Sequence, residues 1–167
     1  GSGKSTLTAA LIASGFQYCT DELVLLKRHS HTIQAAPAAI GIKTGAWTVL
    51  QSFYPALEDR PVFLRQDEKQ VRYLLPPKHL LADETAQCYP LHSLVFPRYQ
   101  PELPTRLSRI SPADALCRLA EAGYDMKGGL DTERVKELVD WIAEISCYEL
   151  QVRDLREAVS RIAALLE

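Results

Sequence analysis

The feature that most constrains this chain is its opening stretch, Gly1-Ser2-Gly3-Lys4-Ser5-Thr6. Its third to fifth residues match the last three fixed positions of G-x-x-x-x-G-K-[ST], the phosphate-binding loop (P-loop). In such a loop, backbone N–H groups surround the phosphates, the lysine reaches the β- and γ-phosphates, and the final hydroxyl binds Mg²⁺. The stretch therefore predicts a site for ATP and Mg²⁺ formed by Gly1, Ser2, Gly3, Lys4, Ser5 and Thr6.

The residues that follow this loop predict a helix. Residues 6–13 are rich in Ala and Leu, and Ser14-Gly15 is a suitable C-terminal cap. A helix that starts at the loop directs the positive end of its dipole at the phosphates. The first fixed glycine and the strand that leads into the loop would precede residue 1, so we expect the chain to be truncated at its N-terminus.

Composition limits the classes of protein and partner. With 167 residues, of which 47% are hydrophobic and 24% charged, the chain is expected to form a single domain over residues 1–167. The net charge is −2 and no basic run occurs, so neither nucleic acid nor a membrane is an expected partner. No apolar run approaches the ~18 residues of a membrane span. The widely spaced cysteines indicate no zinc site or disulfide framework, and are expected to be buried thiols in a reducing cytoplasm: Cys19, Cys88, Cys117 and Cys147.

Strand-like and helix-like stretches alternate without repeats, which predicts an α/β fold with helices packed on a central sheet. Pro97 is expected to end one strand, and a Gly-rich link is expected at residues 127–129. The expected strands are 16–19, 23–26, 33–37, 39–43, 71–75, 91–96, 106–110 and 147–152. The expected later helices are 46–53, 111–122, 131–145 and 155–166. The second is expected to start with Ser111 as its N-cap and Pro112 at its first position, and the third to open at Asp131 with Val135, Leu138, Val139 and Ile142 on one face.

An acidic pair, Asp21-Glu22, narrows the class of P-loop protein. Asp21 follows Lys4 by 17 residues, directly after the first helix and between two expected strands. In transport and motor ATPases the metal-binding acid comes many tens of residues later, and we find no signature loop or glutamine loop of a transporter. An early acid is typical of kinases, where a carboxylate beside the γ-phosphate accepts a proton from the incoming hydroxyl or holds the metal.

Several stretches in the same order resemble the catalytic domain of HPr serine kinase/phosphorylase and its relatives. They are the GSGKST loop, the helix ending in Ser-Gly-Phe, residues 18–25, Ala36-Pro37, residues 40–45 and, more loosely, residues 106–111 and 147–150. The resemblance implies a P-loop domain with a mixed sheet flanked by helices, related in fold to phosphoenolpyruvate carboxykinase. It also implies transfer of the γ-phosphate of ATP to a serine of a small carrier protein, a peptide or, in some relatives, a small molecule. Whether the chain forms a homo-oligomer is left open by the sequence.

The resemblance also implies roles for individual residues. The family's Asp-Asp falls on Asp21 and Glu22, which makes Asp21 the candidate base and, with Ser5, the candidate metal ligand. The family's Glu-Ile-Arg-Gly falls on residues 41–44, where Gly41 replaces the acid and Lys43 keeps the basic position. Asp21, Glu22 and Lys43 are therefore the expected catalytic residues. Loss of the acid implies a kinase without phosphorolysis, acting on an acceptor other than HPr itself.

Some alternatives stay open at this stage. A further cation over the γ-phosphate could be Lys43, Arg72 or Arg106, although Arg106 and Arg109 also suit an exposed strand edge. His29 and His31 are expected in a hairpin turn. One rival function is a small-molecule kinase of the shikimate or gluconate kinase type, for which residues 127–129 make a poor lid. The other is a regulatory module that binds ATP without transferring phosphate, which the missing acid at position 41 favours.

Overall fold

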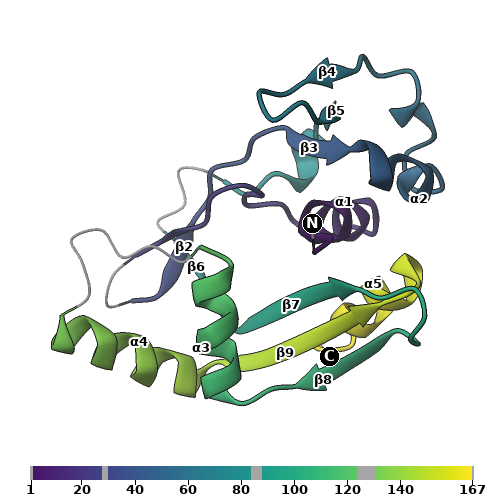
Figure 1. Cartoon of the computed structure of the whole chain (residues 1–167). Coiled ribbons are helices and arrows are strands. Elements are labelled where there is room, and N and C mark those ends of the chain that lie inside the picture. Colours follow the sequence, from purple (N-terminus) through teal and green to yellow (C-terminus); the bar gives the residue numbers. More distant parts are fainter. Residues whose placement is uncertain (1, 28–29, 84–87, 124–130, 167) are drawn as a thin grey trace.

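The computed structural model describes residues 2–27, 30–83, 88–123 and 131–166 (Figure 1). The fold is mixed α/β, with small sheets flanked by helices in place of the expected central sheet. The strands are β1 (Leu25–Leu26), β2 (Thr32–Gln34), β3 (Ile40–Lys43), β4 (Phe63–Leu64), β5 (Gln70–Leu74), β6 (Tyr89–Pro90), β7 (Ser93–Tyr99), β8 (Arg106–Arg109) and β9 (Ser146–Val152). The helices are α1 (Lys4–Ala13), α2 (Trp47–Leu50), α3 (Pro112–Glu121), α4 (Thr132–Glu144) and α5 (Leu155–Ala163), with 3₁₀ turns at Thr44–Ala46, Pro55–Leu57 and Lys78–Leu80.

The described strands form three three-stranded sheets, in the orders β1-β2-β6, β3-β5-β4 and β7-β9-β8. The first two sheets are antiparallel throughout. In the third, β7 runs parallel to β9 and β8 runs antiparallel to it. The connection between the parallel strands passes through β8, α3 and α4, as a parallel pair requires a long crossover.

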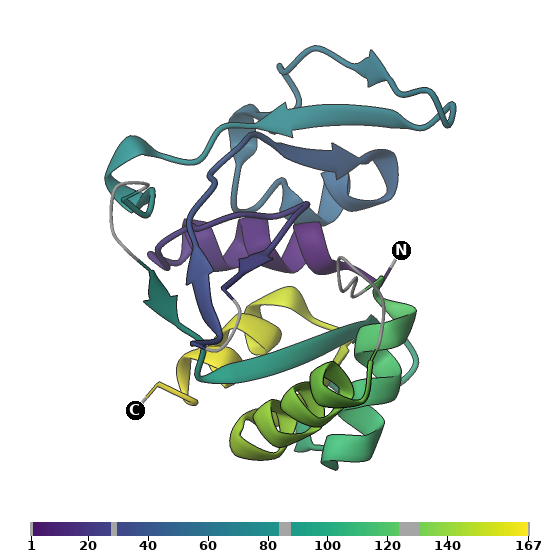
Figure 2. The ribbon, with the colours of Figure 1, turned by 90° about the vertical axis from the view of Figure 1, so that its left-hand side faces the viewer.

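Helix α1 lies between two of these sheets, and Figures 1 and 2 show it with β3 on one side and α5 on the other. Its small buried residues Ala9 and Ala10 allow close approach of the neighbouring elements. The core around it also contains Ile40 and Ile42 from β3 and Leu150 from β9. Because α1 is central to this core, its first turn is held in a fixed position.

Strand β9 contributes to two cores because its side chains alternate between the faces of its sheet. Leu150 and Val152 face the core shared with α1 and α5. Cys147 faces a second core with Trp141 and Ile142 of α4 and Ala115 of α3. The carboxyl end of β9 is thereby fixed close to α1.

Replacing Leu150 with alanine is expected to lower the free energy of unfolding by about 2–5 kcal/mol, since the side chain is fully buried in the middle strand of its sheet. Urea denaturation of the full chain measures the loss. Leu166→Ala is the control, because Leu166 is 71% exposed and its truncation should change stability by less than about 0.5 kcal/mol. Equal losses in both variants would contradict this assignment of the core.

Of two strands predicted near the site, one does not form and the other is much shorter than expected. Residues 16–19 form no strand; Tyr18 makes an isolated parallel bridge to Leu81. In the apolar run 23–26 the pairing is limited to β1, and Leu23 is 64% exposed. An alternating or apolar run predicts a strand only where a partner strand is available, and here the partners are short.

Three further expectations need correction. Pro97 does not end its strand: β7 continues to Tyr99, which is possible because β7 is an edge strand and a proline needs no hydrogen bond on its outer side. Helix α4 buries Trp141 and Ile142, whereas Val135 and Val139 are exposed. The helix expected over 46–53 is a 3₁₀ turn followed by the single turn of α2.

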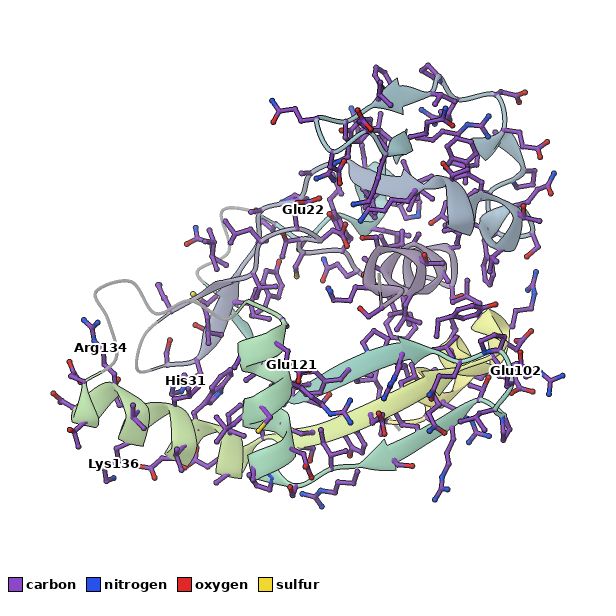
Figure 3. All side chains as sticks on the ribbon, in the orientation of Figure 1. Glu22, His31, Glu102, Glu121, Arg134 and Lys136 are labelled. Atoms are coloured by element: carbon purple, nitrogen blue, oxygen red, sulfur yellow. The ribbon has the colours of Figure 1, made fainter. Side chains whose placement is uncertain are left out.

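Some other local predictions are confirmed, and some concern residues that the structure does not describe. Ser111 caps α3 by accepting a hydrogen bond from the Asp114 N–H at 3.1 Å, with Pro112 in the first turn. His31 lies in the β1–β2 turn, and its ring stacks on Trp141 with 4.9 Å between the centroids, beside α4 in Figure 3. His29 and the link at 127–129 lie outside the described residues.

The cysteines differ from the expected burial. Cys147 is buried, Cys19 and Cys88 are partly exposed, and Cys117 is exposed on α3. None of the helices in the described part of the chain has the length and apolar character needed to cross a membrane.

Candidate nucleotide-binding site

The first turn of α1 has the backbone of an anion site. Gly3 has φ = 92°, a left-handed conformation that side-chain-bearing residues rarely adopt, and its carbonyl accepts the Leu7 N–H at 2.9 Å to begin the helix. No side chain caps this end among the described residues. The first N–H groups of α1 therefore remain available, and the helix dipole favours a negative group there.

The predicted acid lies against this turn. The hydroxyl of Ser5 donates a hydrogen bond to Asp21 Oδ2 at 3.0 Å. Tyr18 fixes the intervening segment: its hydroxyl donates to the Ala38 carbonyl at 3.0 Å, and its own N–H donates to the Leu80 carbonyl at 2.7 Å. The segment after α1 thus returns the chain to the start of the helix, although it forms no strand.

The surroundings of Asp21 make its carboxyl more basic than usual. Burial raises its pKa, and the negative charge of Glu22 adds to this effect. The hydrogen bond from Ser5 and the charge of Lys4 act in the opposite direction but do not cancel the rise. A carboxylate with a raised pKa beside a cation is a better proton acceptor than a free one at neutral pH.

A cavity of about 570 Å³ opens at this turn, which is a typical size for a site that takes a small molecule or cofactor. One wall is the start of α1 with Asp21 and Glu22, and a second is formed by β3 and the 3₁₀ turn that follows it. The far wall comes from Tyr99 at the end of β7 and Arg153 after β9. The cavity therefore joins segments from both ends of the chain.

The structure brings most of the predicted site residues together. The members of the expected set that line this cavity are Ser2, Gly3, Lys4, Ser5, Thr6, Asp21, Glu22 and Lys43. Gly1 lies outside the described residues. Lys4 is exposed, with its ammonium 3.3 Å from Ser2 Oγ. Glu22 is also exposed, and Figure 3 shows it beside the start of α1, below the sheet of β3 and β5.

The lining of the cavity distinguishes among the three side chains that the sequence offered as a further cation over the γ-phosphate. Lys43, at the end of β3, lines it. The guanidinium of Arg72 lies 4.1 Å from the centroid of the Trp47 ring and is not part of the lining. Arg106 is exposed on β8 and is also absent from the lining. Lys43 is therefore the member of the three that can face a ligand here.

Sequence reasoning missed a second cation, Arg153, and the residue that positions its backbone. Arg153 directly follows β9 and lines the cavity. Thr105 is a buried polar residue, 3% exposed, whose hydroxyl accepts the N–H groups of Arg153 at 3.1 Å and Asp154 at 2.9 Å. In α/β folds, ligands bind at the carboxyl ends of strands. The position of Arg153 directly after the expected strand 147–152 was therefore the signal in the sequence that could have identified it.

Replacing Arg153 with glutamine is expected to weaken binding of a fluorescent ATP analogue by at least about tenfold, since a charge-assisted contact to phosphate contributes about 1.5–3 kcal/mol. Arg106→Gln serves as the matched control, because Arg106 is an exposed arginine outside the cavity. Equilibrium titration of both variants gives the comparison. An equal loss in the control would mean that general surface charge, and not the cavity, governs binding.

The oxygen atoms at the start of α1 suit Mg²⁺. Mg²⁺ prefers oxygen ligands, and in phosphate sites it usually takes one or two from the protein and the others from phosphates and water. Ser5 Oγ and Asp21 Oδ2 are such a pair. A cluster of three or more His, Cys, Asp or Glu side chains that could hold a metal ion was not found among the described residues.

Comparisons of the chain with protein-family models, with curated proteins and with solved structures found no match. A functional proposal therefore depends on the residues of this cavity and their geometry.

Proposed function

We propose that this chain is the catalytic domain of an ATP-dependent kinase of the HPr-serine-kinase-like type, which transfers the γ-phosphate to a serine of a peptide or small protein. The observation that carries the proposal is the 3.0 Å hydrogen bond from Ser5 to Asp21, at the first turn of α1 and next to Lys4. A hydroxyl, a carboxylate and a lysine at one helix start are the groups that phosphoryl transfer requires.

In the proposed reaction the acceptor hydroxyl oxygen forms a bond to the γ-phosphorus, and the bond from that phosphorus to the β–γ bridging oxygen breaks. Asp21 accepts the hydroxyl proton, and ADP leaves with the bridging oxygen. Lys4 and the free N–H groups of α1 bind the phosphates, and Lys43 and Arg153 offset their negative charge. Mg²⁺, when bound through Ser5 and Asp21, supplies further neutralisation of the phosphate charge.

A non-catalytic ATP-binding module is the second candidate, and one observation favours it. At Gly41, where the resembling family has an acid, an added Cβ would lie 3.7 Å from the ring of Tyr73. This is an ordinary contact distance, so a larger residue would fit at position 41, and it is the missing carboxylate that favours the module. No observation in the described residues favours a small-molecule kinase in the same way. Residues 127–129, which the sequence made a poor candidate for the lid of such an enzyme, lie outside the described residues.

Transfer of labelled γ-phosphate from ATP with Mg²⁺ tests the proposal directly, with the full chain offered free serine, a mixture of serine-containing peptides and a cell extract. We expect label on a peptide or protein serine. Nucleotide binding without any labelled acceptor would favour the regulatory module. Failure to bind nucleotide in a protein that carries every fixed position of the loop would contradict the P-loop interpretation itself.

A further inference from the structure

We propose that a second cavity, over the β4–β5 hairpin, is the acceptor subsite, and that it takes an apolar side chain adjacent to the acceptor serine of a peptide. The inference rests on the proposed kinase function, since it assigns the second substrate of the same site. It concerns a part of the molecule to which neither the P-loop motif nor the resemblance gives a role.

The two cavities adjoin at the candidate catalytic residues. The second has a volume of about 730 Å³ and shares Glu22 and Gly41 with the first. A nucleotide bound at the start of α1 would fill the first cavity. An acceptor hydroxyl that reaches Asp21 from the side of Glu22 would come from the second cavity.

Charged and polar side chains line part of the second cavity, and three large exposed apolar side chains, Phe63, Leu64 and Tyr73, line it as well. Phe63 is 47% exposed, Leu64 72% and Tyr73 40%. The rings of Phe63 and Tyr73 meet edge to face with 5.4 Å between centroids, so the aromatic wall exists without a ligand. Contiguous large apolar side chains that face solvent are candidates for a binding surface.

The hairpin is also tied to the acidic pair. Arg65, which follows β4, donates a hydrogen bond to Glu22 Oε1 at 3.4 Å, and its Nε lies 3.6 Å from Asp67 Oδ1. The turn is closed by the Arg65 N–H, which donates to the Lys69 carbonyl at 3.0 Å. The apolar wall is therefore linked to a carboxylate of the candidate catalytic site.

A peptide fits this arrangement better than a small polar acceptor. The sheet order leaves the outer edge of β4 without a partner strand in the described part of the chain, so an extended segment can lie along it. A small hydroxylated metabolite could bind the polar side chains of the lining, such as Arg65 and Asp67, but it would leave Phe63, Leu64 and Tyr73 uncovered. A peptide can place its serine at Asp21 and a neighbouring apolar side chain against Leu64.

The test uses fluorescent nine-residue peptides with one central serine, followed by Leu, Phe, Gly or Asp. Binding to the full chain is measured by anisotropy with Mg²⁺ and a non-hydrolysable ATP analogue, and binding of the analogue is titrated separately. We expect the Leu and Phe peptides to bind at least about tenfold more tightly than the Gly and Asp peptides. Leu64→Ser should remove this preference, whereas Leu75→Ser, at a residue 63% exposed and outside both cavities, should keep it.

The outcomes separate this inference from the kinase proposal. Equal binding of all four peptides, or a preference that survives Leu64→Ser, would overturn the subsite even if phosphate transfer is found. A Leu preference abolished by Leu64→Ser together with nucleotide binding would support the acceptor subsite. The same preference without nucleotide binding would show a peptide site at this cavity, and would overturn both the kinase and its acceptor subsite. If Leu64→Ser instead lowers the sedimentation mass and leaves peptide binding unchanged, a second copy of the chain occupies the cavity and the inference is wrong.

Discussion

Asp21→Asn is expected to reduce γ-phosphate transfer by about 100-fold to 10,000-fold, the usual contribution of a positioned general base, while ATP still binds. Asparagine has nearly the same shape as aspartate and keeps an oxygen that can accept the Ser5 hydrogen bond, but it cannot take the proton of the acceptor. Single-turnover transfer and equilibrium nucleotide binding, measured on the same preparation, separate the two effects.

The stability of this variant provides its control. Burial raises the pKa of Asp21 in the folded chain above its value in the unfolded chain. The stability that Asp21 contributes is therefore fully present below its unfolded-state pKa and is lost as pH rises through its folded-state pKa. At neutral pH the ionised carboxylate is thus a cost to the folded state, and Asp21→Asn should not lower Tm. A lower Tm together with lost transfer would show that Asp21 has a structural role instead.

The same pKa shift predicts how transfer depends on pH. The base must be ionised to accept a proton, and kcat/KM reports the free protein before ATP and Mg²⁺ bind, so kcat/KM should fall as pH decreases through the raised pKa of Asp21. This descending limb should be absent from the residual activity of Asp21→Asn. A profile of the same shape in both proteins would assign the ionisation to a different group.

Lys4→Ala is expected to lower transfer by at least about 100-fold and to weaken ATP binding, since a preorganised donor aimed at developing charge commonly contributes that much. The fold should not change, because Lys4 is exposed and its ammonium lies against the equally exposed Ser2. Lys78→Ala is the matched control, as Lys78 is an exposed lysine that lines neither cavity. If both variants retain full ATP binding, the P-loop interpretation is wrong.

Local patterns predicted the helices better than the sheets. The Ala/Leu run after the loop, the Ser111-Pro112 start of α3 and the Asp131 cap of α4 are signals within a few residues, and each helix forms there. Strand predictions depended on distant partners. Residues 16–19 have a strand pattern but make a single bridge, because the partner segment near Leu81 offers no further pairing.

For the candidate site too, residues close together in the sequence were predicted and a distant one was missed. The motif and the early acid identified Ser5 and Asp21, and the structure places them in hydrogen-bond contact. Lys43 was one of three candidates for the further cation, and it is the one of the three that lines the cavity. Arg153 was missed, because it lies at the opposite end of the chain and reaches the cavity through the pairing of β7 with β9.

The sequence by itself determined the start of α1 and the hydroxyl, lysine and carboxylate that can meet there. These features depend on local backbone preferences and on spacings of fewer than about twenty residues, which a short chain segment specifies alone. The far wall with Arg153, and the exposed apolar hairpin beside Glu22, were decided by the tertiary structure. Side chains from distant segments share a cavity only after α1 is buried between β3 and α5, and no local pattern in the sequence encodes that packing.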